Sequence, residues 1–452
     1  MSKQMVGVCL AAAAWLAAAT PATAADTRVA EAAKRQDLPG LRALVGNRAD
    51  VNAPMPDGAT ALHWAVQWND TEAVDLLLRA RAAVNAKNDY GIAPLSLACT
   101  NRSEAIVTRL LAAGADANVT ADTGETALMT CAYTGNPATV RALIQRGADV
   151  NRRERFEAQT ALMWAATQGN AEVVGLLLDA GADLHARSRE REHFVCFTTQ
   201  CGADENERSL SGRVKRGGYS ALLFASRQGD LGTVRLLLDR GAPIEEEGAD
   251  GYNPLLLATH SGHLEVMRYL LSRGANPNVA TPGYTPLHTA IVRGDVEEVQ
   301  ALIKAGANVN TPVVKAAPME RFTDKWMILP LAVIGYTPLQ LAAKYVEVPI
   351  LRELIAAGAD PKVATVKGDV PFGPPSGTTP LMDLVGVSIN RNGSTDRRGR
   401  TVDVALVTLM NQDEAGILEG AKVLVEAGVS VTAANKNGDT ALHGAAGMGM
   451  RK

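Results

Sequence analysis

Much of the chain consists of short amphipathic stretches separated by turns that contain glycine. The stretch that starts at Pro286 shows the pattern, because Leu287, Ala290 and Ile291 are spaced as on one face of a helix. A second apolar face follows the turn at Gly294. Its residues are Val296, Val299, Leu302 and Ile303. The pattern predicts two short helices joined by a tight turn.

This helical hairpin recurs along the chain. A leucine in a box of the type Thr-Pro-Leu-His marks the start of each copy. The ten marker leucines are Leu62, Leu95, Leu128, Leu162, Leu222, Leu255, Leu287, Leu339, Leu381 and Leu442. Most successive markers lie 32 to 34 residues apart, and four gaps are longer. With the excess in these gaps set aside, the chain has room for about 10 to 11 units, which is typical of a repeat array.

The residues of the box have recognisable roles in a helix. Thr285 is a good N-cap, Pro286 suits the first helical position, and Gly306 is expected to end the second helix in a left-handed conformation. One such unit cannot bury its apolar face alone, so neighbouring units must stack to form the core. Low aromatic content, 4%, also favours packing of small residues between helices.

The boxes and their period resemble the ankyrin repeat family, from about residue 27 to the C-terminus. The resemblance implies a mostly α solenoid of helix-turn-helix units joined by β-hairpin finger loops. It also implies that the protein binds a partner in the groove formed by the first helices and the finger loops.

The first residues have the pattern of a secretory signal peptide. Lys3 precedes an apolar stretch at 5–19, which is short for a membrane span, and small residues at 22–24 suit a cleavage site. We expect residues 1–24 to be removed and residues 25–452 to form the repeat domain. No later stretch is long and apolar enough to cross a membrane. The mature protein is therefore predicted to be exported, to the periplasm or alternatively to the extracellular space.

Four insertions interrupt the repeats, near 189–216, 312–334, 364–376 and 388–415. The first three fall in finger loops, and the fourth separates the two helices of one unit. Long loops within a compact array are often functional. The second insertion is apolar and includes Trp326, so it either folds over the groove as a lid or presents an anchor to a partner.

Units six to nine share a tyrosine before the box and cationic or histidine residues near the end of the first helix. Tyrosine offers rigid contact area with a polar group, and cations suit an acidic partner. The predicted partner-binding residues are Tyr219, Tyr252, Tyr284, Tyr336, Arg227, His260, Arg293, Lys344 and Trp326. A purely structural interpretation stays open, because tyrosine and long polar side chains are ordinary at these positions.

The remaining candidate chemistry is sparse. Cys196 and Cys201 are close enough for a small disulfide loop, which an oxidising compartment permits. His63, His288 and His443 occupy the box, where the imidazole forms structural hydrogen bonds in the related family, and His263 lies in a turn. These sites give no metal-ligand arrangement, and no cofactor is expected.

No phosphate-binding loop, zinc-protease motif or nucleophile elbow is present, and the repeats leave no room for a catalytic domain. The formal net charge of −3 gives no reason to expect nucleic-acid binding. The sequence therefore predicts a non-catalytic scaffold or adaptor that binds another protein, with an acidic surface as one option for that partner.

Two alternative functions remain open. A small-molecule or cofactor binder would use 312–334 as a lid, and a secreted effector directed at a host would share the same repeats. The sequence also ends inside the first helix of a unit, at Lys452, which predicts self-association or fraying at an uncapped apolar end.

Overall fold

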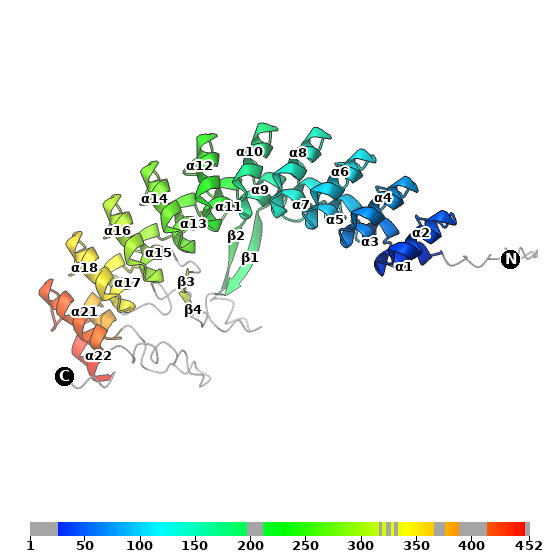
Figure 1. The fold of residues 1–452 in the computed structure, drawn as a ribbon. Coiled ribbons are helices and arrows are strands. Elements are labelled where there is room, and N and C mark those ends of the chain that lie inside the picture. Colours follow the sequence, from blue (N-terminus) through cyan, green and yellow to red (C-terminus); the bar gives the residue numbers. More distant parts are fainter. Residues whose placement is uncertain are drawn as a thin grey trace, which may run out of the picture. The chain divides into compact units, whose positions relative to one another are not determined.

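The computed structural model describes residues 26–196, 211–315, 319–321, 327–329, 333–365, 376–387 and 414–447. The chain divides into two compact parts, each with several repeats, which we call unit 1 (Met1–Asp116) and unit 2 (Ala117–Lys452). Both are built from pairs of short helices (Figure 1). The predicted mostly α architecture of helix-turn-helix repeats is therefore confirmed.

Unit 1 contains three helical hairpins. Its helices are α1 (Arg28–Lys34), α2 (Leu38–Gly46), α3 (Ala61–Gln67), α4 (Thr71–Arg79), α5 (Pro94–Thr100) and α6 (Glu104–Ala112). The first helices α1, α3 and α5 pack side by side, and the second helices α2, α4 and α6 form a second layer.

Unit 2 continues the same arrangement. Its helices are α7 (Ala127–Thr134), α8 (Pro137–Gln145), α9 (Ala161–Thr167), α10 (Ala171–Asp179), α11 (Ala221–Gln228), α12 (Leu231–Asp239), α13 (Pro254–Ser261), α14 (Leu264–Ser272), α15 (Pro286–Arg293), α16 (Val296–Lys304), α17 (Pro338–Lys344), α18 (Val348–Ala356), α19 (Pro380–Leu384), α21 (Glu414–Glu426) and α22 (Ala441–Gly447). The first helix of each pair in this unit (α7, α9, α11, α13, α15 and α17) lies on the inner side of its curve (Figure 1).

Two antiparallel strand pairs lie within the first two insertions. Strands β1 (Arg191–Cys196) and β2 (Ser211–Arg216) form a ribbon that leaves the helices between α10 and α11 (Figure 1). Strands β3 (Met319–Arg321) and β4 (Met327–Leu329) pair in the same way. Among the described residues each sheet has these two strands and no third.

The helix ends follow the roles read from the sequence. The Thr285 hydroxyl accepts a hydrogen bond from the backbone N–H of His288, and the His288 Nδ1 accepts one from the Thr285 N–H at 3.0 Å. Gly294 ends α15 with a φ of 73°, in the left-handed region that glycine adopts without steric cost. This reciprocal capping satisfies backbone donors that the helix itself leaves unpaired.

Asparagines tie several of the second-helix turns to the next one along the chain. The Asn278 side chain donates to the Gly306 carbonyl at 3.0 Å and accepts from the Asn308 N–H at 2.7 Å. Asn118 and Asn151 make the equivalent pairs of hydrogen bonds earlier in unit 2. These bonds explain why asparagine recurs after the second helix.

The core lies between the two helix layers and between successive pairs. Leu287, Ala290, Ile291, Val299 and Leu302 are fully buried, as the periodicity predicts. In the part of the chain that the structure describes, no helix is long and apolar enough to span a membrane.

Candidate functional site

Two aromatic side chains lie on α7 and α9, which are first helices of their repeats in unit 2. Tyr133 is 48% exposed and packs edge-on against Trp164, with 5.8 Å between the ring centroids. Such a pair offers rigid, partly apolar contact area that loses little entropy when a partner binds.

A second cluster lies on α11 and the loop before it. Tyr219 packs edge-on against Phe224 at 5.6 Å, and the Arg227 guanidinium lies 5.3 Å from the Phe224 ring and 5.7 Å from the Tyr219 ring. The guanidinium is held by these aromatic faces yet stays exposed. It is therefore a preorganised cation on the first-helix face.

A chain of tyrosines connects three successive repeats, beginning at Tyr219. The Tyr219 hydroxyl donates to the Asp250 carboxylate at 2.6 Å, and the Asp250 carboxylate accepts from the Tyr252 N–H at 3.2 Å. The Tyr252 and Tyr284 hydroxyls are hydrogen-bonded to each other. Burial raises the pKa of the Asp250 carboxyl, although the hydrogen bond from Tyr219 opposes this shift.

A third group lies where α13, α15 and α16 meet. Arg293 donates to the His260 carbonyl at 3.2 Å, and its Nε lies 3.8 Å from the Glu298 carboxylate. Burial lowers the pKa of the His260 imidazole, and the positive charge of Arg293 lowers it further. Arg293 therefore connects two neighbouring repeats.

The last group is fully enclosed. The Tyr336 hydroxyl donates to the Asp383 carboxylate at 2.8 Å, and the Lys344 Nζ lies 5.6 Å from the Tyr336 ring centroid. Burial lowers the pKa of the Lys344 amine, and the Asp383 carboxylate opposes that shift.

These positions change the interpretation of the predicted binding residues. Tyr219, Tyr284 and Tyr336 are 9%, 1% and 0% exposed, so they offer little contact area to a partner. Their side chains connect neighbouring repeats instead. The prediction that Lys344 lies on an exposed basic stripe is wrong, because this residue is 7% exposed and packs against Tyr336. Burial of the tyrosine hydroxyls is offset by their hydrogen bonds to carboxylates or to each other.

The other predicted residues have mixed positions. Arg227 and Arg293 reach solvent, and His260 and Tyr252 are half-buried. Trp326 and Cys201 lie outside the described residues, and Cys196 is described only through its backbone in β1. A role for the nine residues in partner binding stays a prediction.

The histidines of the box do form structural hydrogen bonds. The His63 Nδ1 accepts from the Thr60 N–H at 3.1 Å, and His443 makes the same bond to Thr440. His263 caps the end of α11 through the Arg227 carbonyl at 3.0 Å. Within the described residues, no three His, Cys, Asp or Glu side chains come together as a possible metal site.

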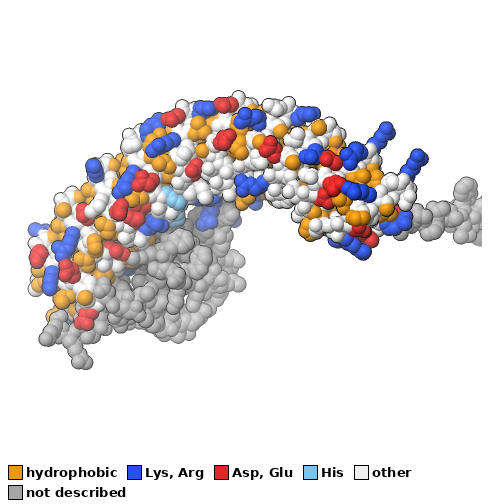
Figure 2. Space-filling view, viewed as in Figure 1, with side chains coloured by type: hydrophobic (Ala, Val, Ile, Leu, Met, Phe, Trp, Pro, Cys, Tyr) orange, Lys and Arg blue, Asp and Glu red, His pale blue; other side chains and the backbone are white. Residues whose placement is uncertain are grey.

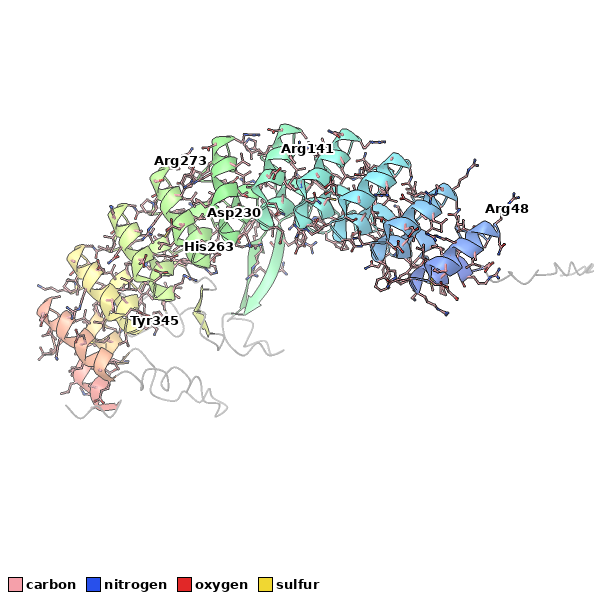
Figure 3. The ribbon with its side chains drawn as sticks, viewed as in Figure 1. Arg48, Arg141, Asp230, His263, Arg273 and Tyr345 are labelled. Carbon is pink, nitrogen blue, oxygen red and sulfur yellow. The ribbon has the colours of Figure 1, made fainter. Side chains whose placement is uncertain are left out.

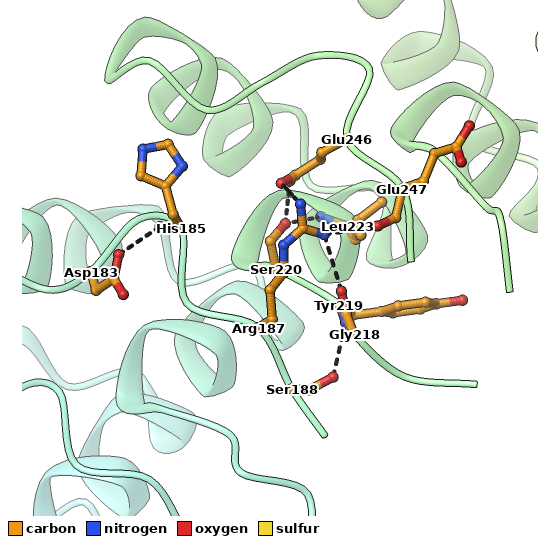
Figure 4. A network of polar contacts seen from close by, with 10 residues as sticks. All are labelled: Asp183, His185, Arg187, Ser188, Gly218, Tyr219, Ser220, Leu223, Glu246 and Glu247. Atoms are coloured by element: carbon orange, nitrogen blue, oxygen red, sulfur yellow. Dashed lines mark hydrogen bonds and ion pairs between the residues drawn. The ribbon is translucent and has the colours of Figure 1, made fainter. Parts of the chain in front are cut away.

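The sequence analysis missed a polar network at the base of the β1–β2 ribbon (Figure 4). Arg187 donates to the carbonyls of Gly218 and Glu247, both at 3.0 Å, and forms an ion pair with Glu246 at 2.8 Å. The Ser220 hydroxyl also donates to Glu246. Burial raises the pKa of Glu246, against the effects of Ser220 and Arg187. The network fixes both ends of the first insertion.

The sequence analysis also missed Tyr133, Trp164 and the exposed Phe156. Their signal was available, because each is an aromatic residue in a chain that has few of them. They do not share the position of the tyrosines before the box, so the repeat pattern does not group them.

Comparison with known families agrees with this geometry. The family model described as ankyrin repeats (three copies) matches residues 29–121, 95–188, 189–281, 222–313 and 280–365. No curated protein matches the chain. The family matches extend over more than half of the chain and coincide with the stacked helical hairpins, so the chain belongs to the ankyrin repeat family.

Proposed function

We propose that this protein is a non-catalytic scaffold, exported from the cytoplasm, that binds a partner protein on the first-helix face of unit 2. Ankyrin repeats generally mediate protein–protein interactions, because their stacked units create an extended surface. The observation that supports this face is the placement of Tyr133 and Arg227, both exposed and both held by aromatic neighbours.

Rigid aromatic and guanidinium groups are the side chains most often found at the energetic centre of protein interfaces. Tyr133 packs against Trp164, and Arg227 packs against Phe224 and Tyr219, so little side-chain freedom remains to be lost on binding. The first-helix face therefore has two preorganised anchors.

The first prediction concerns capture of the partner. The mature chain, Ala25 onward, is expected to retain one protein from periplasmic extract at stoichiometric amount, as identified by mass spectrometry. A Tyr133→Ala/Arg227→Ala variant is expected to weaken this complex at least tenfold, because each lost anchor contributes about 1 kcal/mol or more. Isothermal titration with the purified partner measures the difference.

The control for this experiment replaces exposed residues on the second-helix face. Arg141 lies on α8, in the row of second helices (Figure 3), and Lys304 ends α16. An Arg141→Ala/Lys304→Ala variant should bind like the wild type. Equal affinity for all three proteins would contradict the first-helix face as the binding site.

Export is supported by the predicted signal peptide and by two further cysteines. Cys99 and Cys131 are fully buried and are disulfide cysteines, and disulfides persist mainly in oxidising compartments.

A second prediction tests export directly. Residues 1–30 fused to alkaline phosphatase, an enzyme that needs disulfides to be active, are expected to give activity in bacterial cells. Deletion of the apolar stretch 5–19 should abolish that activity. N-terminal sequencing of the full-length product is expected to start at Ala25; a product that keeps Met1 and stays in the cytoplasm would overturn the proposed location.

A further inference from the structure

The β1–β2 ribbon, together with Phe156 beside it, forms a second exposed surface on unit 2. We call it the arm surface and define it by Phe156, Arg189, Arg191, Arg213, Lys215 and Arg216, all of which are exposed. Figure 2 shows blue Lys and Arg side chains at the lower edge of the described part, where the ribbon leaves the helices. The first-helix anchors Tyr133 and Arg227 do not belong to it.

The base of the arm, which is the end of the β1–β2 ribbon next to the helices, is held by several hydrogen bonds. Besides the contacts of Arg187, the Ser188 N–H donates to the Tyr219 carbonyl at 3.0 Å, and the Tyr219 N–H donates to the Ser188 hydroxyl at 2.9 Å. The Arg189 N–H donates to the Glu157 carbonyl at 2.6 Å. The arm is therefore attached to the finger loops on both of its sides.

Phe156 is held in place by its own finger loop. The buried Glu154 carboxylate accepts hydrogen bonds from the N–H groups of Phe156 and Glu157, at 2.6 and 2.7 Å. Arg191, at the start of β1, donates to the Phe156 carbonyl at 2.5 Å. The ring is nevertheless 58% exposed, so the loop presents a large apolar side chain to solvent next to the arm.

In the described part of the arm, the cations Arg189, Arg191, Arg213, Lys215 and Arg216 outnumber the exposed acids Glu190 and Glu192, so this part has an excess of positive charge. Arg191 and Arg216 are opposite each other in the strand register, which places two like charges on the same side of the ribbon. Glu157 and Glu192 form ion pairs with Arg191 and Arg213.

Three cations of the arm surface form no ion pair with another residue that the structure describes. Arg189, Lys215 and Arg216 have no ion-pair partner within 4 Å among the described residues, although the charge of Arg216 does act on Asp250 to lower the pKa of that carboxyl. A bound anionic group would relieve the repulsion between Arg191 and Arg216.

The ribbon also offers backbone groups. Since its sheet has two strands within the described residues, each strand has one edge with no neighbouring strand there. An extended peptide can pair with such an edge, and its alternating side chains then lie on both faces of the ribbon. Cations are present on both faces, because Arg216 and Lys215 are adjacent in the strand and point to opposite sides.

From these observations we infer that the arm binds an extended acidic segment of a partner protein, which adds to an open ribbon edge and contacts Phe156. Cations on edge strands repel a second copy of the same arm, so the charge selects an acidic strand and disfavours self-pairing. This inference rests on the proposed function, because it specifies the chemistry of a partner segment.

Fluorescence anisotropy with a labelled ten-residue peptide of alternating Glu and Val tests the inference on the full mature chain. The wild type is expected to bind this peptide, and added salt is expected to weaken the complex. An Arg189→Gln/Lys215→Gln/Arg216→Gln variant should lose at least tenfold in affinity. The charge-matched control Arg141→Gln/Arg146→Gln/Lys304→Gln, on exposed positions of the second-helix side, should keep it.

Two further probes separate strand addition from simple charge attraction. An acidic peptide methylated on alternate backbone nitrogens keeps its charge but loses donors for edge pairing, so it should bind at least tenfold more weakly. Phe156→Ala is expected to weaken the unmodified peptide several-fold. Equal binding of the methylated peptide, of a Lys-for-Glu peptide, or by the triple variant would overturn the inference.

The remaining outcomes are also decisive. Tighter binding of a ten-nucleotide oligothymidylate than of the acidic peptide would replace a protein partner by a nucleic acid. If the capture experiment yields a partner but no acidic peptide binds even at millimolar concentration, the inference fails and the proposed scaffold function stands. If the peptide binds but capture yields no protein, the proposed function fails instead.

Discussion

Replacement of Glu298 by glutamine is expected to stabilise the protein at alkaline pH and to leave its stability at pH 4 nearly unchanged. Glu298 lies in the first turn of α16 and is fully buried. Its two carboxyl oxygens accept no hydrogen bond among the described residues, and the Arg293 Nε lies 3.8 Å away. Burial, reinforced by the negative charge of Asp295, raises the pKa of Glu298 to about 8.

The sign of the effect follows from proton binding. An unfolded glutamate loses its proton near the ordinary pKa of 4.5, whereas the folded chain retains the proton up to about pH 8. Between these values the folded state binds more protons, so the free energy of unfolding falls as pH rises. At pH 9 the loss amounts to about 5 kcal/mol, at roughly 1.4 kcal/mol per pKa unit.

Urea unfolding of the wild type and Glu298→Gln at pH 4, 6, 8 and 9 measures this loss. Hydrogen exchange of the α15 and α16 amides should report it locally, since long repeat arrays need not unfold in one step. Glu297→Gln is the matched control, because Glu297 is the preceding residue and is 67% exposed in its ion pair with Arg268. Parallel pH profiles for the wild type and Glu298→Gln would rule out a buried titration at this position.

The second large effect concerns acid. His288 is fully buried in the capping box of α15, and burial lowers its pKa to about 4. Since its Nδ1 accepts hydrogen bonds from the Thr285 N–H and hydroxyl, the imidazole must remain neutral in the folded state. A depressed pKa on a base means that its contribution to stability is present above pH 6.5 and is lost as pH falls toward 4.

His288→Gln is expected to remove this acid sensitivity, which amounts to about 3 kcal/mol between pH 6.5 and 4. The protein itself contains the replacement, because Gln340 forms the same capping box with Thr337 on α17 and does not titrate. The reciprocal change, Gln340→His, should add acid sensitivity in that unit. Thermal unfolding followed by circular dichroism across this pH range measures both. If His288→Gln kept the full slope of the wild type, the neutral capping role would be refuted.

Capping residues are the part of the fold that depends least on tertiary contacts. Thr285, Pro286 and Gly294 could be assigned from the sequence because their roles depend on neighbours within four residues. The apolar periodicity likewise identified Leu287 and Ile291 as core, since a repeated unit places the same positions inside every time.

The predicted contact surface depended on tertiary structure. The tyrosine before the box looks the same in each of units six to nine, but Tyr336 is enclosed and donates to Asp383, which lies 47 residues further along the chain. Lys344 was placed on an exposed stripe by its spacing, yet it packs against the Tyr336 ring. The side of a short helix that is buried depends on the neighbouring repeat and its loop. The residues of the helix itself therefore do not reveal it.

By itself, the sequence determined the period, the helical hairpin, the capping residues and the family, because stacked repeats are specified by contacts within one unit and its immediate neighbour. Only the tertiary structure decided that the Glu298 carboxyl is buried with no hydrogen-bond partner among the described residues, that Arg187 fixes the base of the arm, and that Phe156 is exposed beside it. The physical reason is that burial and charge pairing depend on groups brought together from different units.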